Sequence, residues 1–248
     1  IQKNAIVLHV AQYPGLVYGL TSLRQIISTA AMEQLQWPLL KIYDAPRFGY
    51  RGFLLDIARN FFGPDKIKQV LDLMALFKLN HLDFRLTDDE GWRIEIRGLP
   101  ELTSVGSKRG YSPKKQDRLI PMYGSGADGG LTGNGYLDRA SFISLLKYAH
   151  QRAIKIIPQI SFPSHARAAI KSMDYRYIKL MEEGKMAEAE TFLLSDPNDK
   201  SSYRSAQNYN DNIICICNES AYRFYEKVVD EMVSMYSQAE VPLEIFSI

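Results

Sequence analysis

Short apolar runs alternate with amphipathic segments along most of the chain, and this alternation restricts the fold more than any other feature of the sequence. The apolar runs are typical of strands, whereas the segments between them repeat apolar residues at helical spacing. Strands are expected at residues 5–11, 51–58, 81–86, 154–161 and 243–248, and helices at 21–31, 63–80, 137–153 and 220–239. The stretch YPGLVYG, residues 13–19, is expected to be a turn. Such a series predicts an α/β fold with a parallel sheet.

The connections between these elements differ in length according to the element they follow. Those after strands are long, notably residues 87–136 and 162–219, and those after helices are short. An α/β barrel has this asymmetry when loops at the carboxyl ends of its strands build the site. Four strands fall within residues 47–248, and a barrel needs eight. The chain is therefore expected to form the first half of a barrel.

Composition excludes several classes of protein. The chain has 248 residues, of which 46% are hydrophobic and 23% charged, with a formal net charge of +2, as in an ordinary globular protein. It has no basic block that would indicate a nucleic-acid partner, and no apolar run long enough to predict a membrane span. The chain begins at Ile1, so a signal peptide is expected to be absent or already removed. A start inside a strand-like run also fits a fragment of a longer chain.

The two cysteines, Cys215 and Cys217, are separated by one residue. Alternate residues of a strand lie about 6–7 Å apart, which is too far for a comfortable disulfide. A metal site would need more ligands than the neighbouring sequence offers. We expect two free or externally paired thiols.

Polar side chains stand next to three of the expected strands. One arginine opens the strand at 51–58, three acids follow the strand at 81–86, and a further polar group follows the strand at 154–161. These residues are Arg51; Asp88, Asp89 and Glu90; and Gln159, Ser161 and His165. In a barrel they would meet on one rim, where they would suit sugar hydroxyls or acid–base chemistry. The alternative is structural, with Asp88 and Glu90 capping a loop and pairing with Arg93.

Several stretches resemble the family-20 glycoside hydrolases, and within that family the chitobiase branch of the β-N-acetylhexosaminidases. Among them are YDAPRFGYRGFLLDIARNFF, LTDDEGWRIEIRGLPELTSVGSKRG and SFPSHARAAIKSMDYRY. The resemblance implies that residues 1–46 are the end of a small α/β domain, and that residues 47–248 are the first four β/α units of a catalytic barrel. It also implies a secreted, periplasmic or lysosomal location, and no cofactor or metal.

The resemblance carries a reaction with it. Family members remove terminal N-acetylhexosamine with retention, because the 2-acetamido oxygen of the sugar attacks the anomeric carbon while a glutamate acts as acid and base. The implied ligands are glycans that contain N-acetylglucosamine. Arg51, Asp88 and His165 match family residues that hold or support the terminal sugar. The acid pair of the family lies in a GGDE segment that these 248 residues do not contain, so no catalytic residue is assigned.

Other family positions carry different residues here. Histidines and carboxylates of the barrel interior are replaced by Asp83, Arg85, Gln159, Ser161 and Ser247. Asp83 and Arg85 share one face of a strand, so we expect them to pair with each other or with Gln159. Three interpretations follow: part of an active hexosaminidase, a non-catalytic relative that binds sugar or serves in an assembly, or a half-barrel without activity of its own. A partner chain or a further segment is expected to complete the barrel.

Overall fold

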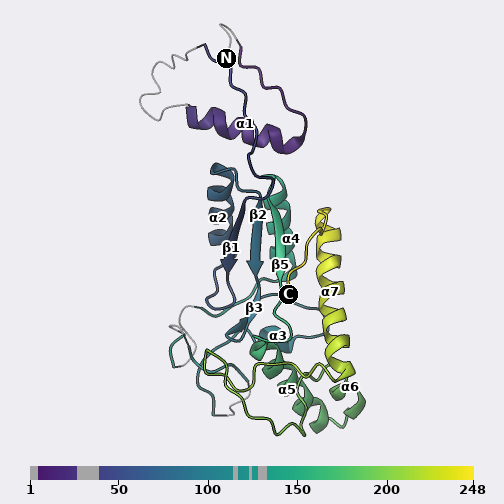
Figure 1. The fold of residues 1–248 in the computed structure, drawn as a ribbon. Coiled ribbons are helices and arrows are strands. Elements are labelled where there is room, and N and C mark those ends of the chain that lie inside the picture. The colour runs from purple at the N-terminus through teal and green to yellow at the C-terminus, as the bar shows by residue number, and fades with distance from the viewer. Residues whose placement is uncertain (1–4, 27–38, 114–116, 123–124, 128–132) are drawn as a thin grey trace.

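A parallel sheet of three strands forms the centre of the molecule. The computed structural model describes residues 5–26, 39–113, 117–122, 125–127 and 133–248. In the sheet, β1 (Gly52–Asp56) pairs with β2 (His81–Arg85), which pairs with β5 (Lys155–Gln159), and both pairings are parallel (Figure 1). These strands lie within the ranges expected from the sequence, and the predicted α/β class is confirmed.

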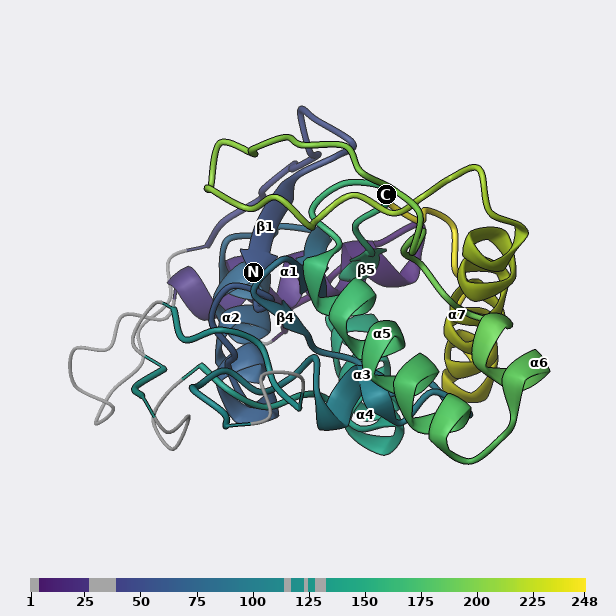
Figure 2. The same cartoon turned by 90° about the horizontal axis from the view of Figure 1, so that it is seen from below.

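Three long helices cover one face of this sheet. They are α2 (Pro64–Leu76), α4 (Arg139–His150) and α7 (Glu219–Ala239), and Figure 2 shows them on one side of the strands. Each begins where the sequence predicts, with Pro64 in the first turn of α2 and the Asp138 carboxylate accepting a hydrogen bond from the Ser141 amide at the start of α4. No helix in the described residues is both long and apolar enough to span a membrane.

The two faces of the sheet differ in chemistry because successive residues of a strand point to opposite sides. Leu82, Phe84 and Ile156 face the helices and belong to the buried core. Arg85 pairs in register with Gln159, and both lie on the opposite face together with Asp83. The face away from the helices is therefore the polar one.

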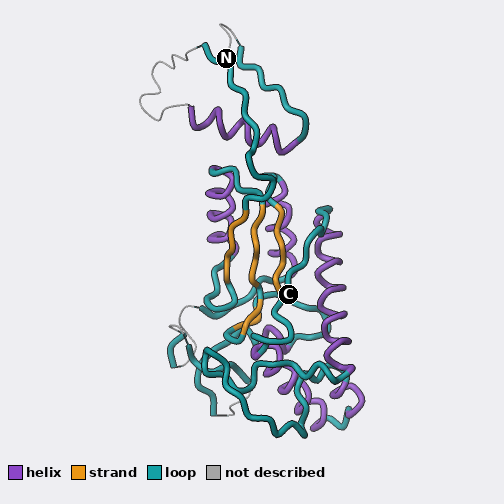
Figure 3. Tube along the Cα trace, viewed as in Figure 1, coloured by secondary structure: helices purple, strands orange, loops and turns teal. Residues whose placement is uncertain are grey.

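The long connections after the strands contain more regular structure than the sequence analysis expected. The segment 87–136 holds a short hairpin, β3 (Thr87–Asp88) and β4 (Gly91–Trp92), and the helix α3 (Glu101–Ser104). The segment 162–219 holds α5 (Arg167–Glu182) and α6 (Met186–Glu190). From the sequence these connections were identified only as long, with no elements placed in them, and most of this end of the molecule is loop (Figure 3).

The N-terminal part also differs from expectation. The helix α1 (Tyr13–Ile26) covers the stretch 13–19 that was expected to be a turn, and no strand forms at 5–11. The expected helix at 21–31 is confirmed as far as Ile26, beyond which it lies outside the described residues. Helix α1 lies beyond the amino ends of the strands (Figure 1), where the Tyr13 hydroxyl donates to the Gln151 carbonyl at 2.7 Å.

At the other end of the chain, the expected strand at 243–248 is reduced to one parallel bridge between Ser247 and Gln159. The Ile160 amide donates to the Ser247 carbonyl at 3.1 Å, and the Ser247 amide to the Pro158 carbonyl at 3.0 Å. This segment continues the sheet beyond β5. Cys215 and Cys217 do not pair with each other, as expected.

Candidate functional site

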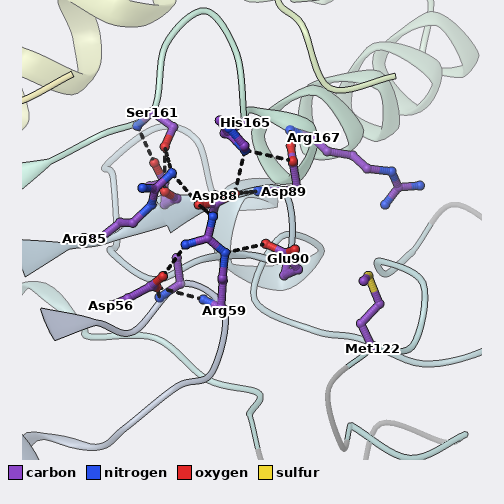
Figure 4. Close-up of polar contacts among 12 residues, drawn as sticks. Asp56, Arg59, Arg85, Asp88, Asp89, Glu90, Met122, Ser161, His165 and Arg167 are labelled. Carbon is purple, nitrogen blue, oxygen red and sulfur yellow. Dashed lines mark hydrogen bonds and ion pairs between the residues drawn. The ribbon is translucent and has the colours of Figure 1, made fainter. Parts of the chain in front are cut away.

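The polar residues of interest gather where the loops leave the carboxyl ends of the strands. Figure 4 shows an arginine after β1, an arginine and three acids at and after β2, and a serine, a histidine and an arginine after β5. These residues are Arg59; Arg85, Asp88, Asp89 and Glu90; and Ser161, His165 and Arg167. Loops at this end of parallel strands are where α/β proteins place their ligands.

Arg59 enters the cluster from the turn after β1. The Asp56 carboxylate accepts the amides of Ala58 and Arg59 at 2.9 and 3.1 Å, which fixes the turn. The Arg59 guanidinium then lies 2.6 Å from Asp56 Oδ2 and 3.0 Å from Asp88 Oδ2, with 35% of its side chain exposed. Sequence analysis missed Arg59, although its place three residues after a strand is a signal that could have found it.

Arg51 does not join this cluster. It precedes β1, at the amino end of the sheet, where its guanidinium donates to the carbonyls of Lys78 at 2.7 Å and Phe48 at 2.6 Å. It also lies over the Tyr18 ring of α1, 5.1 Å from the centroid. The expected meeting of Arg51 with Asp88 and His165 on one rim is wrong, because a residue that opens a strand lies at the opposite end from one that follows it.

Asp88 is the centre of the cluster. Its carboxylate is 1% exposed and lies 2.5 Å from Arg85 Nη2 as well as 3.0 Å from Arg59 Nη2. It also accepts the Asp89 amide at 2.7 Å. Burial raises the pKa of Asp88, and the Asp89 amide, Arg85 and Arg59 oppose that rise. Two guanidinium groups therefore converge on one buried carboxylate.

The expected pairing of Arg85 with Asp83, or with Gln159, is wrong. Arg85 reaches forward along the strand to Asp88 and to the Ser161 hydroxyl, 3.4 Å away, while Asp83 Oδ1 and Gln159 Oε1 have no hydrogen-bond partner. Because residues i and i+2 of a strand lie about 6–7 Å apart, Arg85 pairs instead with the nearer carboxylate of Asp88, beyond the strand end.

Asp89 joins the cluster to the start of α5. One of its oxygens accepts the Arg167 amide at 3.1 Å, and the other accepts the Asn212 side chain at 3.0 Å. His165 Nδ1 lies 3.3 Å from Asp89 and 3.4 Å from Asp88. The histidine has a left-handed backbone, φ 54°, which is uncommon for a residue with a side chain and fits a constrained position at a site.

Glu90 is buried beside these groups without a hydrogen bond to either carboxylate oxygen. Its nearest cation is Arg59, whose Nε lies 3.8 Å away. Burial, reinforced by Asp88, raises the pKa of Glu90 to about 7. The alternative pairing of Asp88 and Glu90 with Arg93 does not form, since the Arg93 side chain donates to backbone carbonyls, including that of Glu90.

The two serines among the replaced positions have backbone and hydroxyl roles. The Ser161 amide donates to Thr87 Oγ1 and its hydroxyl donates to the Thr87 carbonyl, both at 2.9 Å, so Ser161 joins β5 to the hairpin. Ser247 forms the bridge that continues the sheet. Neither serine is placed as a nucleophile beside a base.

Asp88, Asp89 and His165 also lie close enough to share a cation, each offering one ligand atom within 4.8 Å of the others. Arg85 and Arg59 already balance the charge of Asp88, and both Asp89 oxygens accept hydrogen bonds. The arrangement fits a charge-balanced polar network better than a metal centre. Fixed guanidinium donors beside carboxylate acceptors and a histidine suit a ligand with several hydroxyl groups.

Comparison with known proteins agrees with this chemistry. The model of the glycosyl hydrolase family 20 catalytic domain matches residues 48–243. The N,N'-diacetylchitobiase of Vibrio harveyi is 45% identical over 244 residues, which cover 98% of this chain and 27% of that protein. A beta-hexosaminidase of Vibrio vulnificus is 42% identical over 234 residues, with 94% of this chain and 27% of that protein covered.

A solved structure shares the fold. The family-20 exo-β-N-acetylglucosaminidase from Vibrio harveyi in complex with N-acetylglucosamine matches with a TM-score of 0.71 and 33% identity, over 89% of this chain and 31% of that one. The chain thus spans 27% to 31% of these relatives. It belongs to glycosyl hydrolase family 20 and is similar to the chitobiase-like β-N-acetylhexosaminidases of that family.

Proposed function

We propose that this chain is the part of a β-N-acetylhexosaminidase that holds the terminal N-acetylhexosamine of a glycan. Its β/α units would be the first half of an eight-stranded barrel, and a partner chain or a further segment would supply the rest. The family match supports the reaction class, and the Vibrio harveyi relative with bound N-acetylglucosamine supports the sugar. The short share of each relative that the chain spans supports the need for a second part.

The observation that carries the proposal is the Arg59–Asp88 pair. Arg59 is the most exposed of the three arginines in the cluster, and its guanidinium is held by Asp56 at 2.6 Å and by Asp88 at 3.0 Å. A cation held on two sides presents its remaining N–H groups in a fixed direction, which favours recognition of vicinal hydroxyls at low entropic cost. His165, beside Asp88, would support the same sugar from the α5 side.

The proton donor that glycoside cleavage needs has no candidate within this cluster. Asp88 is paired with two arginines, and Asp89 uses both of its oxygens as acceptors. Glu90 has the raised pKa of an acid, but it is 2% exposed, so a glycosidic oxygen would not reach it. We therefore expect these 248 residues alone not to hydrolyse substrate, because substrate assistance replaces the nucleophile and not the acid.

A non-catalytic relative is the second candidate, and the Arg85–Asp88 contact favours it. Arg85 stands where family members carry a histidine, and its Nη2 lies 2.5 Å from the Asp88 carboxylate. A permanent cation at this point would hold Asp88 ionised and would remove a group that can exchange protons. Such a protein would still bind N-acetylhexosamine or serve in an assembly.

Two measurements test the proposal. The purified chain is titrated with N-acetylglucosamine and, as a control, with glucose, while amide signals are followed by NMR; turnover of a chromogenic N-acetyl-β-glucosaminide is assayed in parallel. We expect weak binding of N-acetylglucosamine, lost in Arg59→Ala, and no turnover. Equal response to both sugars, or binding unaffected by Arg59→Ala, would overturn the sugar site. Turnover that disappears in Arg59→Ala would overturn the need for a second part.

A further inference from the structure

Two arginines are wholly buried behind the cluster. Arg93 and Arg109 are both 0% exposed. Arg93 has no carboxylate within ion-pair distance in the described part of the chain, and its donors go to backbone carbonyls instead. Burial, together with the neighbouring Arg109, lowers the pKa of Arg93 to about 9. A buried cation without a counter-ion is costly, so its position calls for an explanation.

The contacts of Arg93 converge on the turn that carries Arg59. Its Nε lies 3.1 Å from the carbonyl oxygens of both Ile57 and Ala58, and its Nη2 lies 2.8 Å from that of Ala58. Its Nη1 binds the carbonyls of Ser107 at 2.9 Å and Gly135 at 3.0 Å, which anchors the guanidinium from the other side. Arg93 thus ties the backbone just before Arg59 to two distant points of the 87–136 connection.

Arg109 continues the same arrangement by one residue. Its Nη1 donates to the Arg59 carbonyl at 2.8 Å, and its Nη2 to the Gly133 carbonyl at 3.1 Å. The three consecutive carbonyls of residues 57–59 therefore all accept hydrogen bonds from buried guanidinium groups. Either arginine alone would leave at least one of these carbonyls without its guanidinium donor.

Glycines leave room for both guanidinium groups. A Cβ at Gly91 would overlap the Arg93 guanidinium, and a Cβ at Gly133 would overlap Arg109 Nη2. At Gly133 the backbone also has φ +92°, which side-chain-bearing residues rarely adopt. The absence of a side chain at Gly91 and Gly133 thus provides the space that the two guanidinium groups occupy.

We propose that Arg93 and Arg109 are positioning residues, which fix the backbone of residues 57–59 so that the Arg59 guanidinium meets the terminal sugar in one orientation. This inference rests on the proposed sugar-binding role of Arg59. Neither arginine touches the sugar; each acts through Arg59. Because ligand contacts depend on sub-ångström placement, loosening this turn weakens binding even when Arg59 itself is present.

A double-mutant cycle on the full protein, with its barrel complete, tests the inference. The affinity for N-acetylglucosamine is measured for the wild type, Arg93→Lys, Arg59→Ala and the double variant. Lysine keeps the charge but cannot bridge several carbonyls at once. We expect Arg93→Lys to lower affinity about tenfold in the presence of Arg59 and to have no further effect in its absence. Arg176→Lys, at a partly buried arginine paired with Glu101 and Glu188, is the control and should leave affinity unchanged.

Hydrogen exchange provides the second readout. The amides of residues 57–59 are bonded to the Arg85 carbonyl and the Asp56 carboxylate, so a loosened turn exchanges faster in Arg93→Lys than in Arg176→Lys. An equal loss of affinity with and without Arg59 would show a merely structural role and overturn the inference, as would unchanged exchange. Unchanged affinity in Arg59→Ala would overturn the proposed sugar site. The exchange result would still decide whether Arg93 fixes the backbone of residues 57–59. If Arg93→Lys does not fold, Arg109→Lys, which releases the Arg59 carbonyl directly, takes its place.

Discussion

Arg51 and Arg59 lie at opposite ends of β1, and only Arg59 contacts the carboxylates of the site. Arg51 is engaged by the carbonyls of Lys78 and Phe48 and by the Tyr18 ring, whereas Arg59 lies beside Asp56 and Asp88. A strand of five residues separates the two by roughly 17 Å or more. The same residue type therefore has a structural role at one end of the strand and the proposed ligand role at the other.

The first prediction is a crossed pattern between these two arginines. Arg51→Ala should lower the free energy of unfolding by about 1–3 kcal/mol, because the part-buried Lys78 carbonyl and the exposed Phe48 carbonyl lose a charged donor, and should leave sugar affinity unchanged. Arg59→Ala should lower sugar affinity about 10- to 100-fold, since charged hydrogen bonds contribute about 1.5–3 kcal/mol. Urea unfolding and sugar titration on both variants check this. Loss of affinity in Arg51→Ala at unchanged stability would contradict the assignment.

The second prediction concerns Arg85. Arg85→Ala should cost about 2–4 kcal/mol, because buried Asp88 loses its nearer cation and keeps only Arg59. Asp83→Asn should be nearly neutral or stabilising, since its buried Oδ1 has no partner to lose. Chemical denaturation of both single variants and the double variant measures their coupling. A coupling energy above about 1 kcal/mol would show that Asp83 and Arg85 interact directly, contrary to the structure.

The third prediction concerns the start of α5. Asp89 accepts the Arg167 amide at the first residue of that helix and the Asn212 side chain from the next loop. Asp89→Ala should cost about 1–2 kcal/mol, as does loss of a helix cap, and should speed amide exchange in the first turn of α5. Asp89→Asn keeps one acceptor oxygen, so its stability should lie between that of the wild type and that of Asp89→Ala. Slow exchange in the first turn of the alanine variant would show that Asp89 does not hold the helix.

The parallel sheet could be predicted from the sequence because apolar runs and helical spacing report which surfaces are buried. The same signal fails in the connections. Helix α5 carries its buried residues Ile170, Met173 and Leu180 between many charged ones, and its cap comes from Asp89, far away in the sequence. Helix α1 has no buried residue in the described structure, so its periodicity gave no reliable boundary.

The candidate site was predictable only in part, and for a geometric reason. Asp88 and His165 follow strands, and the structure brings them within 3.4 Å of each other. Arg59 follows a strand as well, but the resemblance drew attention to Arg51 in its place. The partner of Arg85 could not be read from the sequence, because strand spacing says which residues share a face and not which way a long side chain extends.

The fourth prediction follows from the open edge of β1. In the described part of the chain β1 pairs on one side only, with β2, and its Phe53 and Leu54 are 44% and 54% exposed. An unpaired strand with apolar side chains favours association, so the chain alone should self-associate unless a second part covers this edge. Phe53→Lys should lower the mass found by light scattering. Leu73→Lys, at a leucine on α2 that is 56% exposed, is the control and should not.

The last prediction concerns Glu90, whose pKa is raised from 4.5 to about 7 by burial and by Asp88. Between these two values the folded chain holds a proton that the unfolded chain has released. The contribution of Glu90 to stability is therefore fully present below pH 4.5 and is lost as pH rises to about 7. Glu90→Gln stays uncharged throughout, so its stability relative to the wild type should rise by about 2–3 kcal/mol between pH 5 and pH 8. Urea unfolding at both pH values measures this difference, with Glu226→Gln, exposed on α7, as the control. A difference between wild type and Glu90→Gln that does not change with pH would mean that Glu90 is ionised in the folded protein, held by Arg59.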